Sequence, residues 1–359
     1  MTLSSFFSSP TLTLRGSGVS AEFSSVGQAH DAMAAGAVTT VTGAFGFDPT
    51  GDAALIAPET FGPAAPLSVV TSGFGRAVST ITPADVHADR VRSALAAIGQ
   101  GRVGKAVLAR TLNLRFDDPI DPVALASRFV PGRDATTTTT AFAVPLDAAG
   151  RRGHWLIGAS PELLVRRSGR VVTCHPFAGT APRGSDAASD RAAVESLRAS
   201  DKDLREHAFV VDSLVNALRP LCTELDVPDG PQIQSTPAVW HLATPIRGVL
   251  ADASITSLDL AALLSPTPAV CGTPTTAAAE LIAEIEGPRD FYAGAVGWCD
   301  ASGDGQWLVS IRCLELDAAH TGVTTWAGGG IVAGSDPDAE VAETEAKFRT
   351  VLSALGLSD

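Results

Sequence analysis

The amino-acid sequence predicts an α+β fold in which helices and antiparallel strands follow one another without a regular alternation. Short apolar runs between turn residues predict strands, as in residues 37–45 and in the hairpin pattern of residues 293–316. Apolar residues at helical spacing predict helices, as in residues 84–100. Because no strand–helix–strand rhythm is present, this pattern favours α+β over a doubly wound parallel sheet.

The first half of the chain shows mainly strand patterns. Strands are predicted at residues 37–45, 53–58, 67–75, 106–116 and the first part of 154–184, which continues into a loop rich in glycine and proline. A helix is predicted over residues 84–100, with Gly99 ending its pattern. The threonine run at 136–140 fits either a strand or an exposed loop, and we assign it no role.

The second half carries the longer helical patterns. Residues 186–221 form the longest of them, residues 234–250 predict a strand, and residues 265–286 predict a proline-rich loop that leads into a helix. The hairpin at 293–316 has its turn at residues 300–305. Residues 324–352 predict a strand, a glycine loop and a last helix, with Ser335 or Asp336 as its N-cap.

Composition limits the possible classes of protein. The 359 residues, 45% of them hydrophobic, can bury a large core, and we expect one domain over residues 1–359, with a β-rich N-terminal part at 1–95 and a core at 96–355. The net charge of −13 argues against nucleic-acid binding, which needs a basic face. No leader pattern and no membrane-spanning apolar run is visible. Five scattered cysteines without a CxxC pair fit the reducing cytoplasm.

Lysine is unusually rare in this chain. Of the 26 basic residues only Lys105, Lys202 and Lys347 are lysines. A lysine in a pocket can lose its proton and act as a base, which an arginine cannot do. Residues 99–106, GQGRVGKA, nearly match a phosphate-binding P-loop, but Ala106 lacks the hydroxyl that would hold Mg²⁺ and a strand pattern follows where a helix is required. Lys105 is therefore available for another role.

Two predicted helices carry carboxylates on one face. Asp203 and Glu206 are spaced i, i+3, as are Glu340 and Glu343, and Lys347 follows one turn later. Such pairs are most often solvated helix faces. However, Mg²⁺ binds oxygen ligands and uses one or two carboxylates together with water and substrate oxygens. One inner carboxylate from each helix would therefore suit a magnesium site.

Two further features point to an anionic ligand and to acid catalysis. The glycines 328–330 precede the second acidic helix and offer free backbone N–H groups, although three glycines can also form a tight turn. Glu162 follows Pro161 between two apolar runs. In partly buried surroundings its pKa would rise and it could serve as a general acid, whereas the alternative is a carboxylate that stabilises the turn.

Eight segments, taken in order, resemble the chorismate-utilising enzymes, a family that includes isochorismate, salicylate, anthranilate and aminodeoxychorismate synthases. The matching segments are GKAVLAR, GASPELL, HPFAGTAPRG, KDLREHAFVV, WHLATPIRG, SPTPAVCGTP, FYAGAVGWCDASGDGQWLVSIR and AGGGIVAGSDPDAEVAETEAKF. The resemblance spans roughly residues 100–352. It implies a single α+β domain in which two antiparallel sheets, flanked by helices, enclose a deep cleft.

The resemblance also implies roles for the matching residues. Glu206 and Glu340 are similar to the inner ligands of a Mg²⁺ ion that binds the ring carboxylate of chorismate, and Asp203 and Glu343 to the shell that holds its waters. Arg312 resembles the arginine that binds the enolpyruvyl carboxylate, a task suited to a bidentate guanidinium. The ring-carboxylate clamp corresponds to Gly328, Gly329, Gly330 and Lys347. The cleft lining near the ring corresponds to Gly179, Thr180 and His241.

Two positions indicate the branch of the family. Members that add ammonia have Gln where this chain has Lys105, and members that add water have Lys, which agrees with the need of water for a base. Glu162 would then protonate the departing C4 hydroxyl while water attacks C2. Ala178 stands where aminodeoxychorismate synthases have a nucleophilic lysine, so that branch is disfavoured.

The segment PTPAV favours isochorismate synthase over salicylate synthase, because small Ala269 and aliphatic Val270 replace a polar version. Salicylate synthase, which goes on to eliminate pyruvate, and a catalytically inactive paralogue stay as alternatives. Ser265 departs from the usual histidine before this segment. Lys202 can be given only a charge-balancing role, and the alternative for it is a plain surface lysine. The resemblance implies chorismate and isochorismate as ligands of a monomer without an obligate glutaminase subunit, in siderophore, menaquinone or salicylate synthesis.

Overall fold

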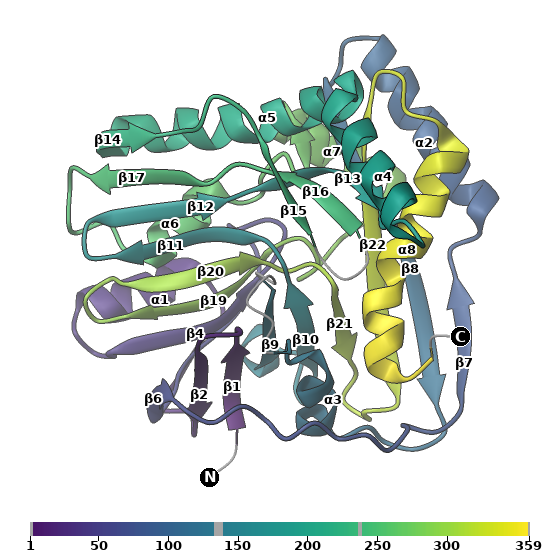
Figure 1. Cartoon of the computed structure of the whole chain (residues 1–359). Helices are drawn as coiled ribbons and strands as arrows, with labels where there is room; N and C mark the ends of the chain where they lie inside the picture. Colours follow the sequence, from purple (N-terminus) through teal and green to yellow (C-terminus); the bar gives the residue numbers. More distant parts are fainter. Residues whose placement is uncertain (1–2, 133–138, 236–238, 358–359) are drawn as a thin grey trace.

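Two large antiparallel sheets form the body of the protein, which the computed structural model describes over residues 3–132, 139–235 and 239–357 (Figure 1). Every pairing between the described strands is antiparallel, including the long β8–β22 ladder. Helices cover both sheets. The predicted α+β class with two antiparallel sheets is therefore confirmed.

The ten-stranded sheet combines strands from both ends of the chain. Across it run β18 (Gly272–Thr273), β8 (Lys105–Phe116), β22 (Gly322–Val332), β21 (Cys313–Leu316), β10 (Trp155–Ser160), β9 (Thr140–Pro145), β1 (Leu3–Ser8), β2 (Thr13–Ser17) and β6 (Thr60–Pro63), and β7 (Ala77–Ile81) also pairs with β8. The N-terminal strands thus extend a sheet whose other end consists of C-terminal strands.

The nine-stranded sheet contains β14 (Cys222–Asp226), β17 (Ile246–Leu250), β12 (Val171–His175), β11 (Leu163–Ser168), β20 (Gly305–Val309), β19 (Ala295–Asp300), β4 (Thr40–Phe45), β5 (Ala53–Ala57) and β3 (Ala21–Phe23). A third sheet, which the sequence did not predict, consists of β13 (Phe177–Pro182), β16 (Val239–Ala243) and β15 (Gln232–Ser235). The buried face of the nine-stranded sheet includes Trp307, which stacks obliquely on Phe45 with ring centres 5.5 Å apart.

Two of the passages of the chain between the large sheets lie next to each other. β10 leads through Pro161 and Glu162 into β11 of the nine-stranded sheet, and β20 leads back through Ile311 and Arg312 into β21. The crossings lie together because β10 pairs with β21 and β11 pairs with β20. The backbone N–H of Val309 also donates to the carbonyl of Glu162 at 3.1 Å.

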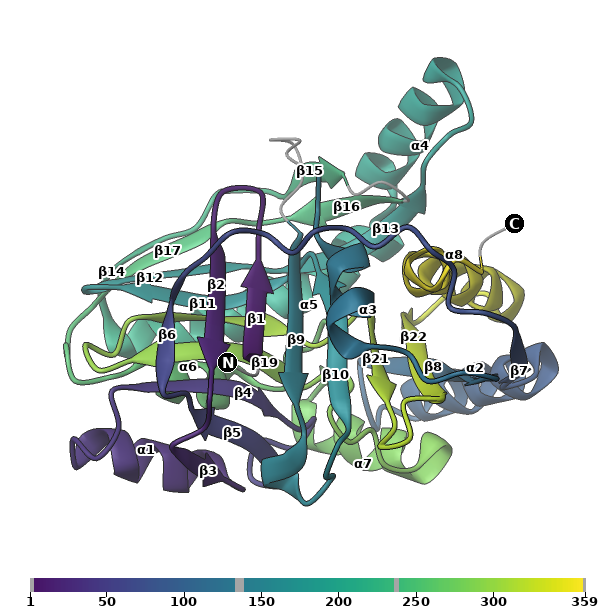
Figure 2. The same cartoon turned by 90° about the horizontal axis from the view of Figure 1, so that it is seen from below.

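Eight α-helices and two short 3₁₀ turns complete the described structure: α1 (Val26–Ala34), α2 (Ala84–Gly99), α3 (Pro122–Phe129), η1 (Asp147–Ala149), α4 (Ala187–Ala199), α5 (Asp201–Leu218), η2 (Arg219–Leu221), α6 (Ser257–Leu264), α7 (Thr275–Glu286) and α8 (Pro337–Leu355). In Figure 1, α2 and α8 lie side by side against β8 and β22. Figure 2 shows α4 projecting from the body beyond β13 and β16. Among the described helices, none is both long and apolar enough to cross a membrane.

Several element boundaries agree with the sequence prediction. The helix at 84–99, the strand at 105–116 and the hairpin turn at 300–305 are all present. The side chain of Asp336 accepts hydrogen bonds from the N–H groups of Asp338 and Ala339, so it is the N-cap of α8. Lys105 begins a strand, which agrees with the rejection of a P-loop.

Other boundaries were wrong where distant strand partners override local pattern. The expected glycine loop at 328–330 is part of β22, because it pairs along its whole length with β8. Likewise, most of the expected loop after residue 175 is strand β13, which pairs with β16. Residues 67–75 form no strand, and Leu67 and Phe74 pack against the core as irregular chain.

The predicted long helix at 186–221 is two helices separated at Ser200. The Ser200 side chain accepts a hydrogen bond from the N–H of Asp203 and so caps α5, while its backbone ends α4. The predicted strand at 234–250 is divided into parts of β15, β16 and β17, and residues 236–238 lie outside the described residues. Of the threonine run, Thr140 begins β9, whereas residues 136–138 lie outside the described residues.

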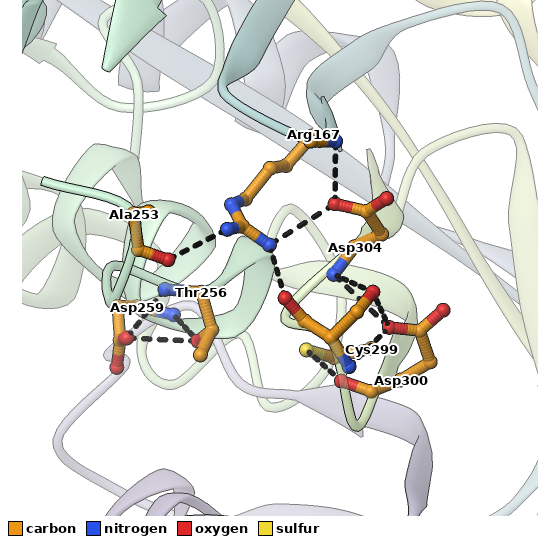
Figure 3. A network of polar contacts seen from close by, with 9 residues as sticks. Arg167, Ala253, Thr256, Asp259, Cys299, Asp300 and Asp304 are labelled. Atoms are coloured by element: carbon orange, nitrogen blue, oxygen red, sulfur yellow. Dashed lines mark hydrogen bonds and ion pairs between the residues drawn. The ribbon is translucent and has the colours of Figure 1, made fainter. Parts of the chain in front are cut away.

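A buried arginine fixes the hairpin turn between β19 and β20 (Figure 3). The Arg167 guanidinium donates to the carbonyls of Ser302 and Ala253, both at 2.7 Å, and to the Asp304 carboxylate at 3.0 Å. Asp304 in turn accepts the N–H of Gly169 at 2.8 Å. Arg167 therefore joins β11, the turn and the segment before α6.

We predict that Arg167→Met lowers the free energy of unfolding by about 3 kcal/mol, because it removes one partner of a buried, hydrogen-bonded ion pair. Calorimetric unfolding measures the change. Arg166→Met is the matched control, since the neighbouring Arg166 is exposed and, in the described part of the chain, donates to Gln306 alone. It should change stability by no more than about 0.5 kcal/mol. Equal losses in the two variants would contradict a specific role of Arg167.

Candidate active site

A cavity of about 670 Å³, partly open to solvent, lies where the two sheet crossings meet the glycine-containing strand. Its walls come from β8, β13, β16, β22, α5, α8 and the loops between them. The lining residues are Val107, Pro161, Glu162, Phe177, Ala178, Gly179, Thr180, Glu206, His241, Ala269, Val270, Tyr292, Ile311, Arg312, Trp326, Ala327, Gly328, Gly330, Glu343 and Lys347.

Most residues that the sequence singled out are brought together here. The cavity wall includes Glu162, Gly179, Thr180, Glu206, His241, Ala269, Val270, Arg312, Gly328, Gly330, Glu343 and Lys347. Lys105, Asp203, Gly329 and Glu340 are not part of the wall but lie next to residues that are. The predicted residues therefore form one spatial cluster, with four of them behind its surface.

Each of the three lysines pairs with a carboxylate of this cluster. Lys105 Nζ is fully buried and lies 3.1 Å from Glu206 Oε1. Lys202 Nζ donates to Glu340 Oε1 at 2.8 Å, so this lysine binds a predicted metal ligand and is not a plain surface residue. Lys347 donates to Glu343, its neighbour one turn earlier on α8. Five side chains from two helices and one from β8 thus form a compact, charge-paired group.

Two glycines of β22 allow the backbone to pass close to the acids. A Cβ atom on Gly330 would lie 2.0 Å from Glu206 Oε1 and 3.0 Å from Lys105 Cε, and one on Gly329 would lie 2.7 Å from Glu340 Oε2. These contacts are closer than a real side chain allows. A side chain at either position would therefore have to displace the carboxylate that faces it.

The pKa values of these acids are shifted in different directions. Burial and the nearby Glu343 carboxylate raise the pKa of Glu340, although the ion pair with Lys202 opposes this. Burial alone would also raise the pKa of Glu343, but Lys347 and Lys202 outweigh it and lower that pKa. Burial likewise raises the pKa of Asp203, which is half-buried. Oε2 of Glu340 is buried without a hydrogen-bond partner among the described residues.

Glu162 is an acid with a strongly raised pKa. Its carboxyl group is buried, which raises its pKa to about 8, against the opposing effects of a backbone hydrogen bond from Phe177 and of Lys105, Lys347 and Arg312. The turn that carries it is held by the Ser160 side chain, which accepts the N–H of Glu162 at 3.2 Å. At neutral pH this group is mostly protonated and can donate a proton.

Whereas Glu162 is an acid whose pKa is raised, His241 is a base whose pKa is lowered. Burial, together with Arg312 and Lys347, holds its pKa well below the usual range, so the ring is uncharged. Its ring is stacked on Phe177, and its Nδ1 atom lies 3.2 Å from Thr180 Oγ1. Nε2 has no partner among the described residues. A neutral imidazole in this position can exchange a hydrogen bond with a ligand.

Two cationic side chains, those of Arg312 and Lys347, line the cavity. Arg312, at the second sheet crossing, has a left-handed backbone with φ of 52° and is nearly buried. Lys347 Nζ donates to the carbonyl of Gly328 at 2.7 Å. A buried guanidinium and an ammonium in one cavity suit a ligand with more than one carboxylate.

Aromatic and aliphatic parts of the wall were missed from the sequence. Tyr292, the chain's one tyrosine, stacks on Trp326 with ring centres 5.5 Å apart, and its hydroxyl faces Gly328. Phe177, Val107, Pro161, Ile311 and Ala327 complete the wall. Their apolar character looks like that of core residues. Only Pro161, Ile311 and Ala327 could have been suspected, because each directly precedes a residue that the sequence had singled out.

The carboxylates do not form a closed metal cage. In the described part of the chain, no group of three or more His, Cys, Asp or Glu side chains is arranged to hold a metal ion. Glu206 and Glu340 nevertheless approach adjacent glycines of one strand from two different helices. Both acids therefore lie against β22, the strand whose Gly328 and Gly330 line the cavity.

Comparison with known proteins agrees with this site. Residues 75–356 match the family described as chorismate binding enzymes. A Mycobacterium tuberculosis protein with a provisional assignment as isochorismate synthase MenF is 46% identical, covering 97% of this chain and 95% of that protein. Isochorismate synthase DhbC of Bacillus subtilis is 41% identical over 88% of this chain and 81% of its own length.

The fold is shared with a solved structure of the same group. The Bacillus anthracis protein DhbC, provisionally assigned as a 2,3-dihydroxybenzoate-specific isochorismate synthase, superimposes with a TM-score of 0.90 at 38% identity and covers 99% of this chain and 97% of that one. The family match spans most of the chain, including both sheet crossings and the residues of the cavity. This chain therefore belongs to the family of chorismate binding enzymes.

Proposed function

We propose that this chain is an isochorismate synthase, which adds water at C2 of chorismate, shifts the ring double bonds and releases the C4 hydroxyl. The observation that carries this proposal is a cavity in which a protonated acid, Glu162, lies among cations that suit the two carboxylates of chorismate. The isochorismate synthases to which the chain is 41–46% identical support the same reaction.

The proton balance follows from two side chains. The neutral amine of Lys105, once its proton is released from the pair with Glu206, accepts a proton from the attacking water, and Glu162 gives its proton to the C4 hydroxyl, which leaves as water. Solvent then returns the proton from Lys105 to Glu162. Arg312 binds the enolpyruvyl carboxylate, and Lys347 with the glycines of β22 binds the ring carboxylate. His241 and Thr180 face the ring, with Gly179, Ala269 and Val270 shaping the wall beside it.

The charged groups fit a magnesium ion. Glu206 and Glu340 would be its direct ligands, with Asp203 and Glu343 holding its waters. The unpartnered Oε2 of Glu340 and the glycines that leave room beside both carboxylates support this assignment. When bound, the ion would neutralise the ring carboxylate of the substrate. In the metal-free protein, the ammonium group of Lys202 would balance the charge of the Glu340 carboxylate.

We further propose that the chain acts in the cytoplasm as a monomer of one domain over residues 1–359. All five cysteines are unpaired, which supports a reducing compartment. Because water and not ammonia is the nucleophile, the reaction needs no glutaminase subunit. Nucleic acid has no part in it, in keeping with the net charge of −13.

Incubation with chorismate and Mg²⁺ should yield isochorismate, identified by chromatography. Lys105→Ala should lower turnover by about 10²–10⁴-fold while calorimetry still detects chorismate binding. Lys105→Arg is the matched variant, because it keeps the charge beside Glu206 but cannot lose its proton, and it should be as inactive as the alanine variant. Salicylate and pyruvate as wild-type products would refute the assignment. An active Lys105→Arg variant would exclude Lys105 as the base.

The activity should fall as pH rises through about 8. Glu162 must be protonated to act as an acid, its pKa is raised to about 8, and kcat/KM reports the ionisation of the free enzyme. The pH profile of kcat/KM measures this directly. Glu162→Gln should lose at least about 100-fold in rate and should no longer show that alkaline decline. A wild-type profile that stays level to pH 9.5 would exclude Glu162 as the general acid.

Gly330→Ala should weaken metal binding by at least tenfold, because its Cβ would displace the Glu206 carboxylate. Titration with Mn²⁺, followed by electron paramagnetic resonance, measures the metal without the need for turnover. Gly62→Ala is the control, since a Cβ there meets open space. An unchanged Mn²⁺ affinity in Gly330→Ala would place the metal away from Glu206.

A further inference from the structure

Arg289 is a buried arginine that the proposed reaction does not use. It follows α7 and is 5% exposed. Its guanidinium forms an ion pair with Glu286 at 2.9 Å, and the side chains of both residues are almost fully buried. A buried charged pair is costly to desolvate and adds little net stability, so a specific geometric task is the better explanation for it.

The remaining N–H groups of Arg289 reach two backbone carbonyls. It donates to the carbonyl of Val270 at 2.7 Å and to that of Val107 at 2.6 Å. Both valines line the cavity, whereas Arg289 itself does not. Val107 lies two residues after Lys105 on β8, and Val270 belongs to the loop that distinguishes the branches of the family by sequence.

Within the described residues, the ladder between β18 and β8 does not extend to these two carbonyls. β18 pairs with β8 only at Gly272 and Thr273, and one more bond joins the N–H of Val107 to the carbonyl of Cys271 at 2.8 Å. Beyond that point the loop turns away from β8. The guanidinium spans the resulting gap, and its flat, forked donors can bridge two carbonyls in a way that a lysine cannot.

The partner acid and the adjacent rings extend this bridge. Glu286 also accepts a hydrogen bond from the N–H of Ala109, which lies two residues after Val107 on β8. The Arg289 guanidinium lies 5.0 Å from the ring centre of Phe47 and 5.8 Å from that of Tyr292, which lines the cavity. Arg289 therefore contacts three residues of the cavity wall from behind, on two sides of the substrate site.

We propose that Arg289 is a positioning residue that fixes the distance between the Val270 loop and the strand that carries Lys105. This inference rests on the proposed function. By holding two walls together, the bridge keeps the ring of the substrate in register with the base and the acid. Displacement of such a wall by about 1 Å can cost about 100-fold in rate.

The test compares Arg289→Met and Arg289→Lys with the wild type, using the KM for chorismate and kcat. Arg289→Met should raise KM by at least about tenfold and lower kcat/KM by about 100-fold. Arg289→Lys keeps the ion pair with Glu286 but cannot bridge both carbonyls, so it should show a smaller rise in KM. KM is the decisive measurement, since partial unfolding reduces apparent kcat without changing KM.

Arg102→Met provides the matched control, because Arg102 pairs at 3.1 Å with Glu284 on the exposed side of the same helix. It should leave both constants unchanged. Mn²⁺ affinity should also be unchanged in all three variants, since none touches the acidic cluster.

If Arg289→Met does not fold, Arg289→Lys decides. A KM within twofold of the wild type in the folded variants would overturn the proposal and leave Arg289 a purely structural residue. A wild-type enzyme that makes no isochorismate would instead refute the proposed function, and this assignment with it.

Discussion

The paired crossing of the chain between the two large sheets is the constraint on which the site depends. β10 and β21 are neighbours in one sheet, and their continuations β11 and β20 are neighbours in the other. The two crossings must therefore stay together. One presents Glu162 and the other presents Arg312, so an acid and a cation are placed in one cavity by backbone pairing. β10 and β21 also approach each other closely at Gly158, because a Cβ atom at this position would lie only 2.6 Å from the Cβ atom of Cys313.

The second constraint is electrostatic. A chain with a net charge of −13 concentrates carboxylates on α5 and α8, where like charges would repel and burial would be costly. Three lysines pair with three of these acids and make the group compact. Such pairs contribute little to stability, and their partners can be exchanged when an anionic ligand and a cation enter. The site thus holds, in the absence of ligand, charges that are complementary to both.

Much of the residue set around the cavity was predictable, because it contains residue types that secondary structure and core packing do not require. Scarce lysines, carboxylates at helical spacing and a glutamate beside proline all pointed to the cavity. Sheet pairing between distant segments could not be predicted in this way. Glycines 328–330 suggested a loop, yet β8 supplies a complete set of hydrogen-bond partners and makes them strand. The break at Ser200 was missed because its side chain competes with the helix backbone, and Tyr292 was missed because a buried aromatic residue resembles core.

The confinement of lysine to the acidic cluster beside the cavity also affects how the protein reacts with chemical reagents. Lys105 is fully buried, and the side chains of Lys202 and Lys347 are only 31% and 15% exposed. The outer surface carries its positive charge on arginines, which do not react with acylating agents or cross-linkers directed at amines. Labelling or immobilisation through side-chain amines would therefore have to take place in the acidic cluster beside the cavity, so that a conjugation method harmless to most proteins would here modify groups that we propose to act in ligand and metal binding.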